Sequence, residues 1–258
     1  MLRLIHFNKL SMCLYLGILA SVSLPVHAQQ CTDAQYGVID QGNYMLQNDE
    51  WNLSAGPGGW QEICTGNSGS NSWSSQWWWP TGSGGIKAYP SIVSGWQYGS
   101  WSPNKNGFPV QVSANAPLAT SVSFSISGNN QFDAAYDLFF SPETNPGTPS
   151  AELMVWLRYS GNQPAGQLTA SNVTLGGVSG TWDVWVGNVG WPVWSFVPNS
   201  QTTSFSGNLQ PFVYYAAYTK GWLNKSWYEL NTEFGAEILQ SNGQNGGITV
   251  NNFSAQAY

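Results

Sequence analysis

Histidine, cysteine and charge are all scarce in this sequence of 258 residues. It contains 2 His, 3 Cys and 7 Lys plus Arg, against 13 Asp plus Glu. Both histidines, His6 and His27, lie within the first 28 residues. The rest of the chain therefore cannot assemble a Ser-His-Asp or Cys-His nucleophile, or a histidine zinc site. Carboxylates are the main acid-base groups that remain.

The first 28 residues have the pattern of a secretory signal peptide. Arg3 and Lys9 precede an apolar run over residues 10–24, and small residues follow at the spacing of a cleavage site, in Val26-His27-Ala28. The run is short for a bilayer span and contains several serines. We expect residues 1–28 to be removed and the protein to be secreted to the extracellular space, without membrane contact and as a monomer.

The remaining chain, residues 29–258, is acidic. Without Arg3 and Lys9 it has 13 acidic and 5 basic side chains, a formal charge of −8, which argues against nucleic acid or an anionic membrane as a partner. Cys31 and Cys64 are the two cysteines left, and in an exported chain they predict one disulfide. We expect no metal and no cofactor.

Short strand-like runs fill residues 29–258, which we expect to form a single domain. They are rich in β-branched and aromatic residues and are separated by Gly, Asn, Pro and Ser. They cover residues 36–39, 44–47, 61–65, 72–79, 110–112, 120–127, 132–140, 151–159, 180–186, 191–198, 202–206, 226–238 and 248–258. Residues 209–222 instead have apolar residues at helical spacing, with Pro211 near the start and Gly221 at the end. The pattern predicts an all-β sandwich of two antiparallel sheets, a jelly roll, with one helix on the outer face.

The run 151–159 sets a carboxylate into an apolar strand. Alternation puts Glu152, Met154, Trp156 and Arg158 on one face and apolar side chains on the other. An ionised carboxylate beside Met and Trp is costly to bury without a partner. This face is therefore expected to line a wet cleft or to give Glu152 a partner, although an isolated Glu in a strand is more often simply exposed.

Two further strands carry carboxylates among apolar residues. Alternation puts Glu233, Gly235 and Glu237 on one face of the run 226–238, and Asp137 lies within the run 132–140. Gly235 is expected to remove bulk where a substrate could approach. Acids set into three apolar strands indicate a site built from carboxylates.

Tryptophan is abundant, with 15 residues. Any single one is more often a packing residue. As a population, flat aromatic faces beside Asn and Gln amides in an exported acidic protein suit sugar rings, because the C–H faces of a pyranose stack on indoles. A polysaccharide is therefore the expected partner.

At these residues the sequence resembles glycoside hydrolase family 12, secreted endo-β-1,4-glucanases and xyloglucanases built on a curved β-jelly roll. The resemblance rests on two segments, Glu152-Leu153-Met154-Val155-Trp156-Leu157 and Phe234-Gly235-Ala236-Glu237. Ala135-Tyr136-Asp137-Leu138-Phe139, Trp194-Ser195-Phe196-Val197 and the placement of Cys31 and Cys64 match in the same order. The match spans nearly all of residues 29–258.

The resemblance implies a role for each matching residue. Glu152 would be the nucleophile, Glu237 the general acid/base, and Asp137 a neighbour that tunes Glu152. Trp51 and Trp156 would stack on glucosyl units of a β-glucan, with Met154 beneath the reactive sugar and Asn48 at a distal subsite. Two departures stand out: Asn48-Asp49-Glu50-Trp51 replaces the common Asn-Asn before the cleft Trp, and Ile238 follows Glu237 where many members have Pro.

Two such carboxylates predict a retaining glycosidase with the nucleophile ionised and the acid/base protonated, which requires their pKa values to be held apart. Retention requires carboxyl groups about 5–5.5 Å apart, against about 6.5–9.5 Å for inversion. The expected activity is that of an endo-β-1,4-glucanase acting on cellulose-type glucans. A xyloglucan-specific endoglucanase, a β-1,4-xylanase of related fold, and a non-catalytic carbohydrate-binding module are the alternatives.

Overall fold

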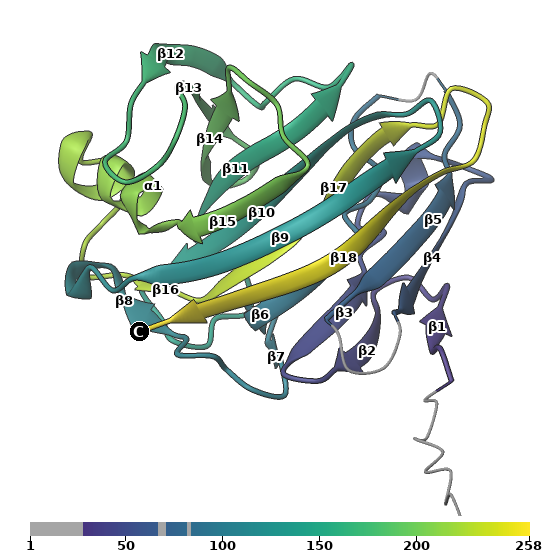
Figure 1. The fold of residues 1–258 in the computed structure, drawn as a ribbon, viewed down its shortest axis with the longest axis horizontal. Helices are drawn as coiled ribbons and strands as arrows, with labels where there is room; N and C mark the ends of the chain where they lie inside the picture. Colours follow the sequence, from purple (N-terminus) through teal and green to yellow (C-terminus); the bar gives the residue numbers. More distant parts are fainter. Residues whose placement is uncertain (1–27, 67–70, 82–83) are drawn as a thin grey trace, which may run out of the picture.

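The computed structural model describes residues 28–66, 71–81 and 84–258, and it confirms the predicted all-β sandwich. The predicted signal peptide, except for Ala28, lies outside the described residues. Two sheets pack face to face and curve together, as Figure 1 shows. The large apolar core lies between them.

The smaller sheet has six strands and lies in front in Figure 1. In spatial order they are β1 (Cys31–Thr32), β4 (Trp60–Thr65), β5 (Trp73–Trp78), β18 (Gly246–Ala257), β9 (Leu118–Ser127) and β15 (Ser204–Asn208). The long β18 and β9 pair from Gly247 opposite Ser127 to Ala257 opposite Leu118, so the C-terminal strand lies in the middle of this sheet.

The larger sheet carries the segments expected to hold the site. Along its main path lie β12 (Gln167–Val173), β13 (Trp182–Asn188), β14 (Pro192–Pro198), β11 (Ala151–Ser160), β10 (Gln131–Ser141), β17 (Asn231–Gln240), β6 (Ser91–Gln97), β3 (Tyr44–Asn48) and β2 (Gly37–Gln41). The short strands β7 (Ser100–Trp101), β8 (Val110–Gln111) and β16 (Tyr228–Glu229) attach to it. The described pairs are antiparallel except β11 with β14, which run parallel, so the predicted purely antiparallel sheet is wrong at that point.

Alternation along the central strand β10 separates the core from the outer face of the larger sheet. Phe132, Ala134, Tyr136, Leu138 and Phe140 point into the main core. The residues between them point to the opposite face, where Ala135 and Phe139 join two smaller apolar clusters. This face of β10, β11 and β17 is therefore built to line a site rather than to join the two sheets.

The predicted helix forms, but it is shorter than expected. One turn of α-helix, α1 (Gln210–Tyr214), continues into a π-helical turn, η3 (Tyr215–Thr219). Phe212 packs edge-on against Trp182 of β13 and Phe196 of β14, with ring centroids 4.9 and 5.1 Å apart. Two 3₁₀ turns, η1 (Leu53–Ala55) and η2 (Val112–Ala114), complete the described helical segments.

The predicted disulfide is present between Cys31 of β1 and Cys64 of β4, which are paired residues in adjacent strands. It ties the N-terminal strand to the edge of the smaller sheet. Within the described ranges, no helix is both long and apolar enough to cross a bilayer.

Glu229 in β16 is a buried carboxyl group for which no basic partner is found among the described residues. It is 2% exposed, its Oε1 makes no hydrogen bond in the described part of the chain, and burial raises its pKa well above the ordinary value of 4.5. Because the folded state holds this proton more tightly than the unfolded chain, stability falls as pH rises above 4.5. We expect Glu229→Gln to raise the Tm by roughly 2–4 °C at pH 8. Little change is expected at pH 4, and thermal unfolding with an equal shift at both pH values would contradict the assignment.

Candidate active site

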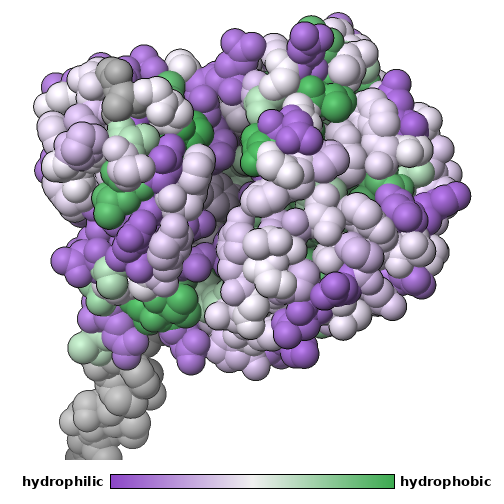
Figure 2. Space-filling view, turned by 180° about the vertical axis from the view of Figure 1, so that it is seen from behind, coloured by the Kyte–Doolittle hydropathy of each residue, from purple (hydrophilic) through white to green (hydrophobic). Residues whose placement is uncertain are grey.

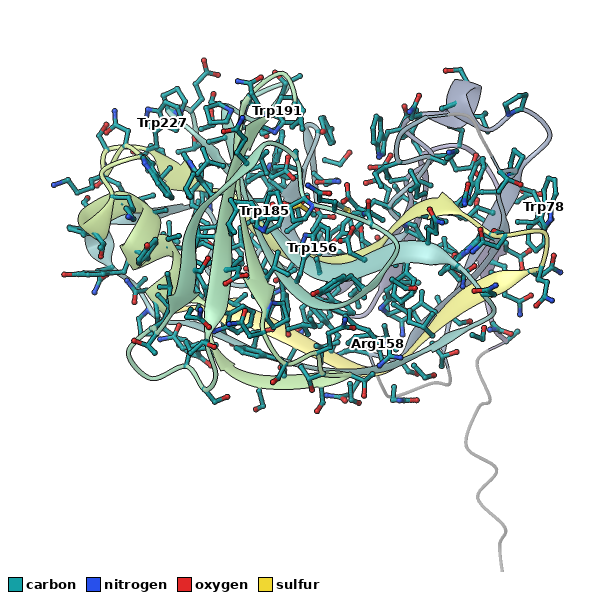
Figure 3. All side chains as sticks on the ribbon, turned by 90° about the horizontal axis from the view of Figure 1, so that it is seen from above. Trp78, Trp156, Arg158, Trp185, Trp191 and Trp227 are labelled. Atoms are coloured by element: carbon teal, nitrogen blue, oxygen red, sulfur yellow. A yellow bond between two sulfur atoms is a disulfide. The ribbon has the colours of Figure 1, made fainter. Side chains whose placement is uncertain are left out.

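A cavity of about 450 Å³ opens on the outer face of the larger sheet. Figure 2 shows the surface hollowed between two lobes, and Figure 3 shows Trp156 in the middle between them with Trp191 on one wall. Six large aromatic side chains line the cavity: Trp51, Tyr89, Tyr98, Phe139, Trp156 and Trp191. Flat aromatic walls of this kind suit the C–H faces of sugar rings.

Five carboxyl groups also line the cavity, Asp49, Asp137, Glu152, Glu233 and Glu237. No Lys or Arg is among the described residues that line it. Carboxyl groups gathered without a cation raise one another's pKa values, and burial adds to the effect. Several of them must therefore hold a proton at neutral pH.

Glu152 lies in β11 on the cavity side, opposite Phe139 of β10. Trp191, just before β14, donates a hydrogen bond from its Nε1 to Glu152 Oε2 at 2.8 Å. Burial raises the pKa of Glu152 to about 7, the charge of Glu237 adds to the rise, and the bond from Trp191 opposes it. The indole thus favours the ionised carboxylate, which is the form that can act as a nucleophile.

Glu237 lies in β17 on the same side, opposite Asp133 of β10. Burial raises its pKa, and the neighbouring Asp133 carboxyl group opposes the rise. Asp133 is fully buried, and burial together with the charge of Glu237 raises its pKa well above the ordinary value. The two carboxyl groups therefore form a pair in which Asp133 keeps its proton.

Glu152 and Glu237 come from strands on either side of β10, at positions offset along it by six residues, from Phe139 to Asp133. In a flat sheet this offset would separate them by about 20 Å along the strand. Both nevertheless line one cavity and the charge of Glu237 acts on Glu152, because the sheet twists and bends around the cavity (Figure 3).

Asp137 lies between the two, opposite Met154 of β11 and Glu233 of β17. Burial raises its pKa well above the ordinary value, and the charge of Glu152 adds the next largest contribution. Its Oδ1 has no hydrogen-bond partner in the described part of the chain. Asp137 and Glu152 therefore raise each other's cost of ionisation, and the unpartnered Oδ1 of Asp137 is buried beside Glu152.

The sequence-predicted binding residues divide into two groups. Trp51, Met154 and Trp156 line the cavity, and Trp51 is 48% exposed there. Asn48 does not line it: the side chain is fully buried, where its amide donates to Ala34 O and its Oδ1 accepts from Gln61 Nε2. The strand β3 ends at Asn48, and the chain turns so that the next residue, Asp49, faces the cavity instead.

Two expectations about the cavity face, one for Arg158 and one for Gly235, are wrong. A β-bulge breaks the alternation in β11, because Trp156 pairs with Ala135 whereas Arg158 pairs with Ala134. Arg158 is therefore exposed and away from the cavity (Figure 3). At Gly235, a Cβ would collide with the carbonyl oxygen of Pro90, so this glycine is required for strand packing rather than for substrate access.

Trp191 and Tyr98, which line the cavity, and Asp133, which is buried opposite Glu237, were not predicted from the sequence. Asp133 follows the same alternation as Asp137, four residues earlier, so that signal was present. Trp191 lies in a turn, and Tyr98 has a left-handed backbone (φ 44°) in the tight turn between β6 and β7, a strand pair that was not predicted. Burial and the charges of Asp49 and Glu152 raise the pKa of Tyr98, so its hydroxyl stays protonated beside the carboxyl groups.

Comparison with known proteins identifies the family. The family model for glycosyl hydrolase family 12 matches residues 42–257. The chain belongs to glycosyl hydrolase family 12. The predicted resemblance is thereby confirmed, and the protein is a glycoside hydrolase of this endoglucanase and xyloglucanase family.

Its relatives within family 12 include enzymes named for two substrates. Endoglucanase S of Pectobacterium parmentieri is 34% identical over 248 residues, covering 92% of each chain. A xyloglucan-specific endo-β-1,4-glucanase A of Aspergillus aculeatus is 30% identical, covering 95% of this chain and 98% of the relative. Among solved structures, the native family 12 xyloglucanase of Bacillus licheniformis superposes with a TM-score of 0.80 at 30% identity, covering 89% of this chain and all of that one.

Potential metal ligands in this family 12 hydrolase gather away from the cavity. Among the described residues, Cys31, Glu62 and Cys64 place ligand atoms within 4.8 Å of one another. The two sulfurs are bonded to each other, so they offer no thiolate to an ion.

Trp191→Phe tests whether the hydrogen bond from Trp191 lowers the pKa of Glu152 in this family 12 hydrolase. The variant keeps an aromatic ring but removes the Nε1–H that favours the ionised carboxylate, so the pKa of Glu152 should rise above about 7. A hydrogen bond to a charged group contributes about 1.5–3 kcal/mol, so the acid limb of kcat/KM should move up by at least about one pH unit. Activity at pH 6 should fall roughly tenfold more than activity at pH 9. Profiles of kcat/KM against pH check this, and an unchanged acid limb would contradict it.

Proposed function

We propose that the protein is a secreted, retaining endo-β-1,4-glucanase that cleaves internal bonds of β-glucans by double displacement. The observation that supports this best is the pair Glu152 and Glu237, which face one aromatic-lined cavity from strands on either side of β10. The arrangement gives one carboxyl group on each side of a bound glycosidic bond, as glycoside hydrolysis requires.

In the first step, ionised Glu152 attacks the anomeric carbon while Glu237 gives its proton to the leaving oxygen. Trp191 favours the ionised form of Glu152 in this step. The C–O bond to the leaving sugar breaks and a covalent glycosyl-enzyme forms on Glu152.

In the second step, the roles of Glu237 change. The ester on Glu152 has no charge, so Glu237, now ionised, takes a proton from water as the water attacks the same carbon from the opposite side. Glu152 leaves as a carboxylate and Glu237 regains its proton. Two inversions give net retention.

Xyloglucan is the second candidate substrate. The Aspergillus aculeatus and Bacillus licheniformis relatives are named for xyloglucan, and each is about as similar to this chain as the endoglucanase relative. Trp51, 48% exposed at the cavity, offers a stacking surface that either an unbranched or a xylosylated chain could use.

Two measurements test the proposal. Reducing-sugar release should be observed on carboxymethyl cellulose or mixed-linkage glucan at rates equal to or above those on xyloglucan, and well above xylan. Activity confined to xyloglucan or to xylan would make that polysaccharide the substrate in place of cellulose-type glucan. Binding of the polysaccharide without release of reducing sugar would refute the proposed hydrolase activity. Proton NMR of the first product should show the β-anomer before mutarotation, and an initial α-anomer would exclude retention.

A further inference from the structure

The residue opposite Glu237 is a second buried carboxyl group. Asp133 and Glu237 are direct cross-strand partners in β10 and β17; Glu237 lines the cavity, and Asp133 is buried beside it, in contact with the cavity residue Asn162. Asp133 is 0% exposed. Side chains directly opposite in an antiparallel pair have Cβ atoms about 4.5–5.5 Å apart, and like charges there are destabilising. Ionisation of both carboxyl groups in this place would therefore be destabilising.

The orientation of Asp133 is fixed from the other side. Asn162 Nδ2, in the loop after β11, donates to Asp133 Oδ1 at 2.5 Å. The other oxygen, Oδ2, is buried and makes no hydrogen bond in the described part of the chain. Asn162 thus holds one oxygen as an acceptor and leaves the other to carry the proton toward Glu237.

No cation competes for this pair among the described residues that face it. The titratable groups around it are Asp137 on β10, Glu233 on β17, Glu152 on β11 and Tyr89 before β6. The Tyr89 hydroxyl donates a hydrogen bond to Ala135 O at 2.9 Å, so it is not the donor to Glu237. A protonated Asp133 is the group placed to donate.

We propose that Asp133 is the positioning residue of Glu237: it stays protonated and donates a hydrogen bond to the Glu237 carboxylate that forms when Glu237 gives its proton to the leaving oxygen. Asp133 makes no covalent bond and loses no proton. Its hydrogen bond strengthens as Glu237 becomes negative, so it stabilises the state after proton transfer more than the state before. The inference rests on the proposed role of Glu237 as the acid/base.

A leaving-group series tests this inference. With aryl β-cellotriosides, kcat/KM reports formation of the glycosyl-enzyme. Dinitrophenolate leaves without a proton, whereas phenolate needs one from Glu237. General acid catalysis contributes about 10²–10⁴-fold, so Asp133→Ala should lower kcat/KM on the phenyl substrate by about tenfold to 100-fold. The dinitrophenyl substrate should change by less than about threefold, because it does not depend on the acid.

A conservative variant of Asp133 separates the effect of its hydrogen bond to Glu237 from the effect of its side-chain packing. Asp133→Asn keeps the shape, can still accept from Asn162 through its oxygen, and can donate to Glu237 through its amide. It should recover most of the rate on the phenyl substrate. Equal losses on both substrates, no loss on either, or an Asn variant as slow as the Ala variant would overturn the proposal.

Three further variants complete the test. Asn162→Ala leaves Asp133 in place and should give a weaker form of the same leaving-group selectivity, which keeps the test open if Asp133→Ala does not fold. Glu229→Gln, a buried carboxyl group outside the cavity, is the matched control and should change neither substrate. Glu237→Ala should itself show the selectivity, and Asp133→Ala should add nothing to it. A Glu237→Ala variant without selectivity would refute the acid/base assignment of the proposed function, whereas selectivity there but not at Asp133 would refute only this inference.

Discussion

Glu152→Gln is expected to lower kcat on β-glucan by about four orders of magnitude or more, because the amide cannot form the glycosyl-enzyme. The side chain keeps its shape, and its amide oxygen can still accept the 2.8 Å hydrogen bond from Trp191. The fold and oligosaccharide binding should therefore be retained. Steady-state kinetics measure the loss, and calorimetric titration with cellotetraose and a melting curve measure what remains.

The matched control is Glu143→Gln, which changes an exposed glutamate in the loop between β10 and β11. It should leave kcat unchanged. If Glu152→Gln kept substantial activity, the nucleophile would have to be another cavity carboxylate. Glu233 would be the next to test, although hydrogen bonds from Ser91 and Asn231 already engage both of its oxygens.

The parts of the site that follow strand alternation could be predicted from the sequence. Glu152, Met154 and Trp156 line the cavity because β11 is regular up to Trp156. Beyond that point the β-bulge turns Arg158 away. A bulge depends on how two strands pair, which a single strand's pattern does not encode.

Contacts between distant segments could not be predicted. Trp191 reaches Glu152 because β14 runs parallel to β11, with Val193 opposite Glu152. The parallel pairing joins residues about 40 positions apart, and no local pattern specifies it. The pairing of Asp133 with Glu237 is similar, since alternation gives the face of each strand but not the register between them.

Glu237→Ala should separate the two steps of the reaction. Loss of the acid/base is expected to lower kcat on β-glucan by about 10²–10⁴-fold, whereas a dinitrophenyl glycoside should still form the glycosyl-enzyme rapidly. Hydrolysis of that intermediate then becomes slow, because no base activates water. Added azide needs no base, so it should restore turnover and give a β-glycosyl azide.

The configuration of the azide product reports from which side of the sugar the azide attacks. A β-azide requires that Glu152 first formed an α-linked ester and that azide displaced it from the cavity side that Glu237 occupies. The small Ala side chain leaves room there, and removing the Glu237 charge also removes a repulsion against the anion. An α-azide would mean that no covalent intermediate forms on Glu152, and failure of azide to accelerate turnover would place the acid/base at another of the cavity carboxyl groups.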